Sequence, residues 1–181
     1  MIEYLLTTSP VLGRDLAEEI HRVVKSSLEH ANKRQNAFSQ RELEAYVSMY
    51  SPDEMIVLKK NPIISAFAFD NEVLVGNGFL AHGKIPDFAA NGIDAFLYGV
   101  YVHPKYKGSF TGIKIYETII EHARNCGIRT IDAFSIFEKN LRHYLSLGYR
   151  KTGEVEFTIG DFKFNFPRVE LSLNPVETIA V

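Results

Sequence analysis

A strand, a glycine-containing loop and a helix follow one another over residues 98–127, and this order suits the binding of an anion. Pro104 ends the apolar run, because proline has no N–H to donate to a sheet. Gly108 and Gly112 remove the Cβ atoms that would keep a phosphate off the backbone, and the amides of a helix N-terminus attract negative charge. Three lysines add positive charge: Lys105, Lys107 and Lys114. Taken alone, the pattern fits a plain strand-to-helix turn with solvated lysines equally well.

Two sequence motifs in this region resemble those of the GNAT (GCN5-related N-acetyltransferase) family. The stretch LYGVYVHPKYKGSFTGIKIYETIIEHARNCGI is similar to the cofactor-binding motif, an apolar strand, Val-x-Pro and Arg/Gln-x-x-Gly-x-Gly/Ala opening a helix. Here the motif is Val102-His103-Pro104, followed by Lys107-Gly108-Ser109-Phe110-Thr111-Gly112. NLRHYLSLGYRKTGE resembles the next motif, in which Tyr144 precedes Leu147-Gly148-Tyr149. The two motifs stand in the family's order, and the resemblance extends over about residues 62–155.

The resemblance implies an acetyl-CoA-dependent N-acetyltransferase that passes an acyl group directly to an amine acceptor, on a small molecule or a protein. It implies that the strand ending at Val102 splays from the next strand and that the pantetheine arm of acetyl-CoA lies in the gap. The implied cofactor-binding residues are Val100, Tyr101 and Val102 for the arm, Lys107, Gly108, Ser109, Phe110, Thr111 and Gly112 for the pyrophosphate, and Asn140 for the arm again. Amides near Val100 would polarise the thioester carbonyl, as an oxyanion hole does.

Two residues depart from the family pattern. Lys107 stands where the family prefers Arg or Gln, and it lacks the planar fork of arginine. Phe110 stands where the family usually has Gly, so its ring is expected to crowd the pyrophosphate or to change the path of the loop. Phe110 keeps open a second function, a non-catalytic GNAT-fold protein that binds or senses acyl-CoA. An acyltransferase for a longer acyl donor is a third.

The resemblance implies that Tyr144 is the general acid that protonates or stabilises the departing CoA thiolate; the alternative is a tyrosine that packs on the sheet. The general base has several candidates from the residues: His82 at a strand end, Tyr101, Asp94, or a water relay to solvent. The acceptor is expected between the N-terminal helices and the loops at 83–93 and 158–163. Aromatic residues at that rim suggest an apolar or mixed small acceptor: Phe79, Phe88, Phe157 and Phe162.

The elements expected around these motifs form a mixed α/β (α+β) fold over residues 1–181, a single domain with one central mixed sheet flanked by helices. Strands are expected at 2–7, 63–69, 73–82, 94–103, 130–134, 152–159 and 162–172, and 56–58 is a short strand or the tail of a turn. Helices are expected over the apolar repeat at 16–28, after the capping box at 39–42, from the loop at 107–111 to Gly127, and from a capping box at 135–138 to about Leu147. Asp70-Asn71 and Gly160-Asp161 are expected to be hairpin turns. The apolar stripe of the third helix is expected to comprise Ile113, Tyr116, Ile120 and Ala123.

Composition narrows the function classes. Twenty basic and 22 acidic residues give a net charge of −2, which is against a general nucleic-acid binder. Cys126 is the only cysteine, so no internal disulfide and no metal site are expected, and a reducing cytoplasmic location fits. No apolar run approaches the length of a membrane span. The last strands and residues 174–181 are a hypothesised edge for a homodimer.

Overall fold

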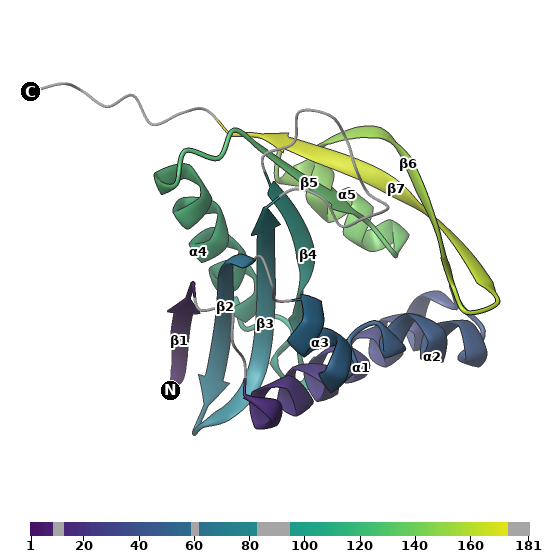
Figure 1. Ribbon diagram of the computed structural model, residues 1–181, viewed down its shortest axis with the longest axis horizontal. Coiled ribbons are helices and arrows are strands. Elements are labelled where there is room, and N and C mark those ends of the chain that lie inside the picture. The colour runs from purple at the N-terminus through teal and green to yellow at the C-terminus, as the bar shows by residue number, and fades with distance from the viewer. Residues whose placement is uncertain (9–12, 59–61, 83–94, 174–181) are drawn as a thin grey trace, which may run out of the picture.

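One seven-stranded sheet forms the centre of the protein (Figure 1). The computed structural model describes residues 1–8, 13–58, 62–82 and 95–173. The strands are β1 (Ile2–Thr7), β2 (Pro62–Asp70), β3 (Val73–His82), β4 (Ala95–Val102), β5 (Thr130–Phe134), β6 (Arg150–Ile159) and β7 (Phe162–Ser172). The helices are α1 (Arg14–Gln35), α2 (Gln40–Ser48), α3 (Pro52–Leu58), the 3-10 turn η1 (Pro104–Tyr106), α4 (Thr111–Asn125) and α5 (Glu138–Ser146).

The sheet is mixed, as the sequence predicts. Its strand order is β1-β2-β3-β4-β5-β7-β6. Strands β1 to β4 pair antiparallel, β4 and β5 pair parallel, and β5, β7 and β6 pair antiparallel again. Since β7 lies between β5 and β6, the edge strands are β1 and β6, and of the last two strands only β6 is open to a second copy.

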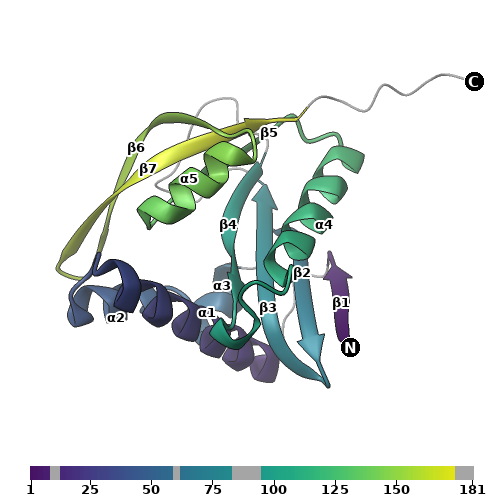
Figure 2. The same cartoon turned by 180° about the vertical axis from the view of Figure 1, so that it is seen from behind.

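Helices cover both faces of the sheet. On one face, α1 buries the predicted apolar repeat against β3 and β4, and α2 and α3 pack with it in one core. On the other face, α4 packs on β2, β3 and β4, and α5 contributes to the same core (Figure 2). Two side chains anchor α1 to the sheet, because Arg22 donates to the carbonyl of Leu74 at 2.7 Å and Glu19 accepts from its amide at 2.8 Å.

Several local predictions are confirmed. Ser39 and Glu42 form the capping box of α2, with the Ser39 hydroxyl accepting from the Glu42 amide and the Glu42 carboxylate accepting from the Ser39 amide. Gly127 has a φ of 74°, as expected for a residue just past a helix end. Gly160 has a φ of 58° in the turn between β6 and β7. These signals are local, which is why the sequence alone predicts them.

Other local predictions are wrong. Residues 56–58 end helix α3, because Ser51-Pro52 with two acidic residues behind it starts a helix; the Ser51 hydroxyl accepts from the Glu54 amide at 3.4 Å. Residues 135–138 form no capping box. In a capping box the third residue of the helix accepts from the amide of the N-cap residue, whereas Glu138 is the first residue of α5. Its N-cap Phe137 has no side-chain cap, and the Ser135 hydroxyl donates to the Phe137 carbonyl.

Two further corrections concern a turn and a helix face. The turn between β2 and β3 is made by Asn71 and Glu72, both with positive φ, and Asp70 belongs to β2. Helix α4 is rotated from the predicted stripe, since Ile113 is 43% exposed. The buried residues of α4 are Thr111, Ile115, Ile119, Ile120 and Ala123.

Two glycines in β3 set how closely α4 approaches the sheet. A Cβ added at Gly78 would lie 2.8 Å from Ile119 Cδ1 and 2.9 Å from Ile115 Cγ2, both side chains of α4. A Cβ added at Gly76 would lie 2.8 Å from Ile115 Cδ1. Such distances are shorter than van der Waals contact, so a side chain at either position would force Ile115 and Ile119, or the helix that carries them, to move.

We therefore expect Gly78→Ala to lower the free energy of unfolding by about 2 kcal/mol, because the added methyl overpacks the interface between β3 and α4. Urea unfolding followed by far-ultraviolet circular dichroism measures this difference. An unchanged midpoint would contradict the view that α4 rests on these glycines.

Some expectations fall on residues that the structure does not describe: the loop at 83–93 with Phe88, the base candidate Asp94, and the tail at 174–181. The backbone of His82 ends β3, whereas its side chain lies outside the described part. Across the described ranges, none of the helices has the length and apolar character needed to cross a membrane.

Candidate functional site

The sheet opens at its centre, between β4 and β5. The two strands are paired only at Ala95 with Ile131 and at Phe96 with Asp132. Beyond these pairs the strands diverge, and Figure 1 shows them separating below their point of contact. Within the described residues no further pairing joins β4 to β5, so the backbone of β4 from Leu97 onward is open on that side.

A β-bulge in β4 sharpens this opening. Phe79 pairs with Gly99 and Leu80 pairs with Leu97, so Tyr98 is the extra residue of the bulge. Gly99 has a φ of 114°, which glycine adopts without strain. The bulge bends β4 at the point where it leaves β5. Sequence analysis missed it, although a glycine inside an apolar strand is a signal for a bulge.

A cleft of about 460 Å³ follows the opening, and we call it the main cleft. It is walled by β4, the loop after it, α4, α5 and residues Ser27, Leu28 and Ala31 of α1. The predicted site residues that line it are Val100, Tyr101, Val102, Lys107, Gly108, Phe110, Thr111, Gly112, Asn140 and Tyr144. Ser109 is the exception; its hydroxyl donates to the Tyr106 carbonyl and bonds the Thr111 hydroxyl at 2.8 Å, which holds the loop in shape.

The start of α4 presents free amides to the main cleft. Among the described residues, the N–H groups of Thr111, Gly112 and Ile113 have no hydrogen-bond partner, and the N-cap residue provides no side-chain cap. All three residues line the cleft. A helix N-terminus with unsatisfied amides is a site for a phosphate or another anion, which fits the pyrophosphate that the sequence resemblance implies.

Phe110 does not fill this anion site. Its backbone is left-handed, with a φ of 60°, so Phe takes the conformation for which glycine would be favoured. Its side chain is 75% exposed at the rim of the main cleft. Phe110 thus has the backbone conformation that favours glycine, and its exposed ring is one wall of the main cleft.

Basic side chains surround the same loop. Lys107 lies close enough to His30 and Arg34 of α1 and to Lys139 of α5 for their charges to interact. Partial burial, and then the charges of Arg34 and Lys139, lower the pKa of Lys107. The charge of Lys107 is the largest cause that lowers the pKa of His30. Such repulsion between cations is relieved when an anion binds among them. Sequence analysis named Lys107 and missed the contribution of α1 and α5, which only the fold brings near.

Tyr144 lies on α5 and faces the main cleft. Its ring contacts the ring of Tyr149 at a centroid distance of 5.0 Å. Within the described residues its hydroxyl makes no hydrogen bond. Burial, and then the neighbouring Tyr116 and Tyr50, raise the pKa of Tyr144 above its ordinary value of 10.0. The phenol is therefore neutral at physiological pH and able to donate a proton or a hydrogen bond.

Of the residues considered as a base, Tyr101 is fully described. It is 7% exposed, and its hydroxyl bonds that of Tyr50 at 2.8 Å. Burial raises the pKa of Tyr101, so it is a neutral hydrogen-bonding group and not a base. Tyr50 and Tyr46, which both come from the α2 region, were missed because no local motif marks them.

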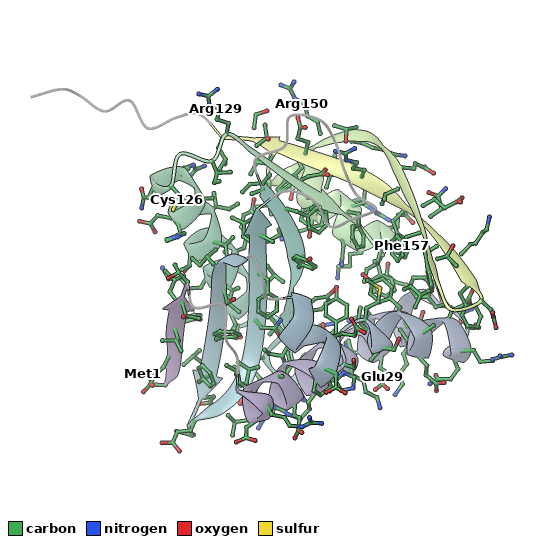
Figure 3. All side chains as sticks on the ribbon, in the orientation of Figure 1. Met1, Glu29, Cys126, Arg129, Arg150 and Phe157 are labelled. Atoms are coloured by element: carbon green, nitrogen blue, oxygen red, sulfur yellow. The ribbon has the colours of Figure 1, made fainter. Side chains whose placement is uncertain are left out.

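The aromatic residues expected at the acceptor rim are mostly in the core. Phe79 packs against Phe67 at 5.9 Å between ring centroids. Phe157, labelled in Figure 3, extends from β6 toward α2 and packs against Tyr46 at 6.4 Å. Phe162 is partly buried, with Arg41 5.8 Å from its ring centroid. Over the described part of the chain, no group of three or more His, Cys, Asp or Glu side chains could hold a metal ion.

The chain is similar in structure to several solved acetyltransferases. A GCN5-related N-acetyltransferase of Rhodopseudomonas palustris matches with a TM-score of 0.71 and 17% identity, covering 96% of this chain and 95% of that one. The PaiA N-acetyltransferase of Thermoplasma acidophilum, solved with coenzyme A, matches with a TM-score of 0.69 and 16% identity over 94% and 99% of the chains. YncA of Salmonella typhimurium, solved with its cofactor acetyl-CoA, matches with a TM-score of 0.57 and 17% identity over 98% of both chains.

A comparison with curated proteins finds no match. The model of the acetyltransferase (GNAT) family matches residues 25–149, which include the C-terminal half of α1, strands β2 to β5, the loop before α4 and Tyr144. This match covers more than half of the chain, and the solved structures share its fold. The chain therefore belongs to the acetyltransferase (GNAT) family.

Proposed function

We propose that this protein is an acetyl-CoA-dependent N-acetyltransferase, with residues 1–181 as one domain, that transfers the acyl group directly to an amine with Tyr144 as general acid. The observation that carries the proposal is the continuity of the main cleft, which connects the free amides at the start of α4 with the open edge of β4 and with Tyr144. One ligand with a diphosphate at one end and a thioester at the other fits that sequence of groups.

Three parts of the main cleft would bind different parts of acetyl-CoA. The amides of Thr111, Gly112 and Ile113, with Lys107 beside them, would hold the pyrophosphate. The unpaired side of β4 would bond the pantetheine arm as a strand does, because its backbone groups have no ladder partner there among the described residues. Asn140 on α5 faces the same cleft and would bond the arm from the opposite wall.

The chemistry follows from these positions. The amine nitrogen forms a bond to the thioester carbonyl carbon while backbone amides of β4 stabilise the oxyanion. The carbon–sulfur bond then breaks, and the thiolate takes the proton of the Tyr144 hydroxyl, or is stabilised by it. The proton that the amine loses replaces the one given to sulfur, so the products are an amide and the free thiol of CoA. Tyr144 suits this role because it is neutral and faces the cleft.

Calorimetric titration with acetyl-CoA, followed by an assay of CoA thiol release with a panel of amines, tests this proposal. We expect binding of one acetyl-CoA and release of CoA that depends on the amine. Acyl-CoAs with longer chains, titrated in parallel, show whether acetyl is the preferred acyl group. The proposal fails if the native protein binds no acyl-CoA at all.

A non-catalytic acyl-CoA-binding protein is distinguished by the same assay, since it would bind acetyl-CoA and release no thiol. The sequence reason for that alternative was Phe110, whose exposed side chain leaves the amides of α4 open. Phe110→Gly restores the residue of the family motif, and we expect this variant and the native protein to bind acetyl-CoA with similar affinity. Binding by the variant alone would mean that Phe110 closes the site in solution.

A further inference from the structure

A second, smaller cavity of about 40 Å³ adjoins the main cleft. Six residues line both: Leu97, Val100, Tyr101, Ile136, Asn140 and Tyr144. The small cavity is completed by Tyr46 of α2, by Tyr98 and Gly99 at the bulge of β4, and by Phe134 of β5. It therefore lies at the bulge, where the sheet opens, and extends from Tyr144 toward the helices on the other face.

The lining of the small cavity is aromatic and uncharged. Ten described residues line it, and none of them is Asp, Glu, Lys, Arg or His. Its polar groups are phenol hydroxyls, the amide side chain of Asn140 and the backbone of the bulge. The Tyr101 hydroxyl is held by that of Tyr50 at 2.8 Å. Burial raises the pKa values of Tyr46, Tyr50 and Tyr101, so these phenols stay neutral and offer oxygen lone pairs to a donor.

Tyr46 provides the strongest sign that the small cavity binds a polar group. It is 1% exposed, and its hydroxyl makes no hydrogen bond of standard geometry to a described residue, although those of Tyr50 and Tyr101 lie close enough to affect its pKa. A buried hydroxyl without a partner is costly, and such groups are rare. Three other buried residues also have polar side-chain atoms without a partner, Ser65, Asn77 and Tyr149, but none of them lines the small cavity or the main cleft. Of the four, only Tyr46 lines one of these two spaces.

We propose that the small cavity receives the nitrogen of the acceptor, and that the acceptor is a small primary monoamine carried on an uncharged, apolar chain. This inference rests on the proposed function and names the substrate class for it. A neutral amine provides the N–H donors that the Tyr46 hydroxyl lacks. The volume admits about three water-sized groups, which fits an amine with one or two carbons and nothing branched.

The surroundings define the rest of the acceptor. Tyr98 and Phe134 are only partly buried, and both rings contact Phe96, at 5.3 Å and 5.9 Å. A chain leaving the cavity along these rings meets aromatic surface, which suits methylene or aryl groups. Among the described residues, the lining offers no carboxylate to a second ammonium and no cation to a carboxylate. Polyamines and amino acids would therefore lose water without gaining a partner.

The same lining helps to prepare the amine for attack. Transfer of an ammonium group from water to an uncharged aromatic cavity lowers its pKa and favours the neutral amine. The cavity thus promotes loss of a proton without a carboxylate base among the described residues that line it. We expect the pH dependence of kcat/KM to follow the ionisation of the amine used, and to shift when an amine of different pKa replaces it.

The inference is tested with two variants and four amines under saturating acetyl-CoA. Tyr46→Phe removes only the unpartnered hydroxyl, and Ser65→Ala is a matched control, because it removes a buried hydroxyl that also has no partner but lines neither cavity. The amines are n-butylamine, spermidine, β-alanine and a short peptide with a free α-amine.

We expect n-butylamine to have the highest kcat/KM. Tyr46→Phe should raise its KM about tenfold without lowering the unfolding midpoint or changing the KM of acetyl-CoA, and Ser65→Ala should leave both KM values unchanged.

The outcomes separate the two proposals. Preference for spermidine, β-alanine or the peptide would overturn the inference and leave the acetyltransferase proposal intact. An unchanged KM for n-butylamine in Tyr46→Phe would overturn it as well. Acetylation of other amines, but of none of these four, would overturn the inference alone. Binding of acetyl-CoA without thiol release for any amine, or no binding of acetyl-CoA, would remove the proposed function and the inference with it.

Discussion

Replacement of Tyr144 by Phe is expected to lower kcat about 100-fold and to leave the affinity for acetyl-CoA within about twofold of the native value. The phenol ring would stay in place, since it packs against Tyr149, so the wall of the main cleft is retained. What is lost is the one proton that the proposed mechanism delivers to the thiolate. An effect on kcat without an effect on binding is the signature of an interaction made in the transition state.

The pH profile gives a second measure of the same role. Burial raises the pKa of Tyr144 above its ordinary value of 10.0, so the hydroxyl keeps its proton throughout the range in which most assays are made. We therefore expect no loss of kcat from ionisation of Tyr144 up to pH 10 in the native enzyme.

Tyr149→Phe is the matched control for Tyr144→Phe. Tyr149 contacts the Tyr144 ring, its hydroxyl is buried without a partner among the described residues, and it lines neither cavity. Loss of this hydroxyl should leave kcat unchanged. Steady-state kinetics and acetyl-CoA titration of both variants make the comparison. Equal values of kcat in native protein and Tyr144→Phe would contradict the assignment of the general acid.

The second large effect is expected at Gly112. Gly112→Trp should weaken acetyl-CoA binding at least 100-fold, because an indole at this position would occupy the main cleft beside the free amides of α4. The space is already limited, since an added Cβ would lie 3.2 Å from Val102 Cγ2. Bulk at Gly112 therefore displaces either the ligand or the end of β4, and both parts belong to the proposed donor site.

Calorimetry measures this loss, and Gly112→Ala provides the graded control. Its methyl group needs a shift of a few tenths of an ångström at Val102 and leaves the amides uncovered, so we expect a change in affinity below about fivefold. Thermal unfolding of both variants shows whether the fold persists. Tight binding by a folded Gly112→Trp protein would exclude the amides at the start of α4 as the anion site.

The sequence alone predicts those parts of the donor site whose residues lie close together in one segment of the chain. Val102 to Gly112 forms strand end, loop and helix start within one segment, so spacing and residue type are sufficient. The same holds for the capping box of α2 and for the turn at Gly160. The start of α5 shows the limit of this approach. Residues 135–138 have the residue types of a capping box. No capping box forms, because Phe137 packs in the core as the N-cap residue and the helix begins at Glu138.

The acceptor side could not be predicted in the same way, because its residues are far apart in the chain. Tyr46, Tyr50 and Tyr101 come from two segments some 50 residues apart and meet only after α1 and α2 pack on the sheet. No periodicity marks a tyrosine hydroxyl as unpartnered, and the aromatic residues named from the sequence are largely core. The rotation of α4 has the same cause, since Gly76 and Gly78 on another strand decide which of its side chains fit.

Those two glycines have a consequence for the tolerance of this protein to mutation. Neither lines the main cleft, yet they fix the height of α4 above the sheet and hence where its first amides lie. A saturation scan scored for acetyl-CoA binding would therefore mark Gly76 and Gly78 as sensitively as Gly112. The positions intolerant to mutation would therefore include β3, which does not contact the donor. Variants designed to change the donor preference would have to keep both glycines of β3.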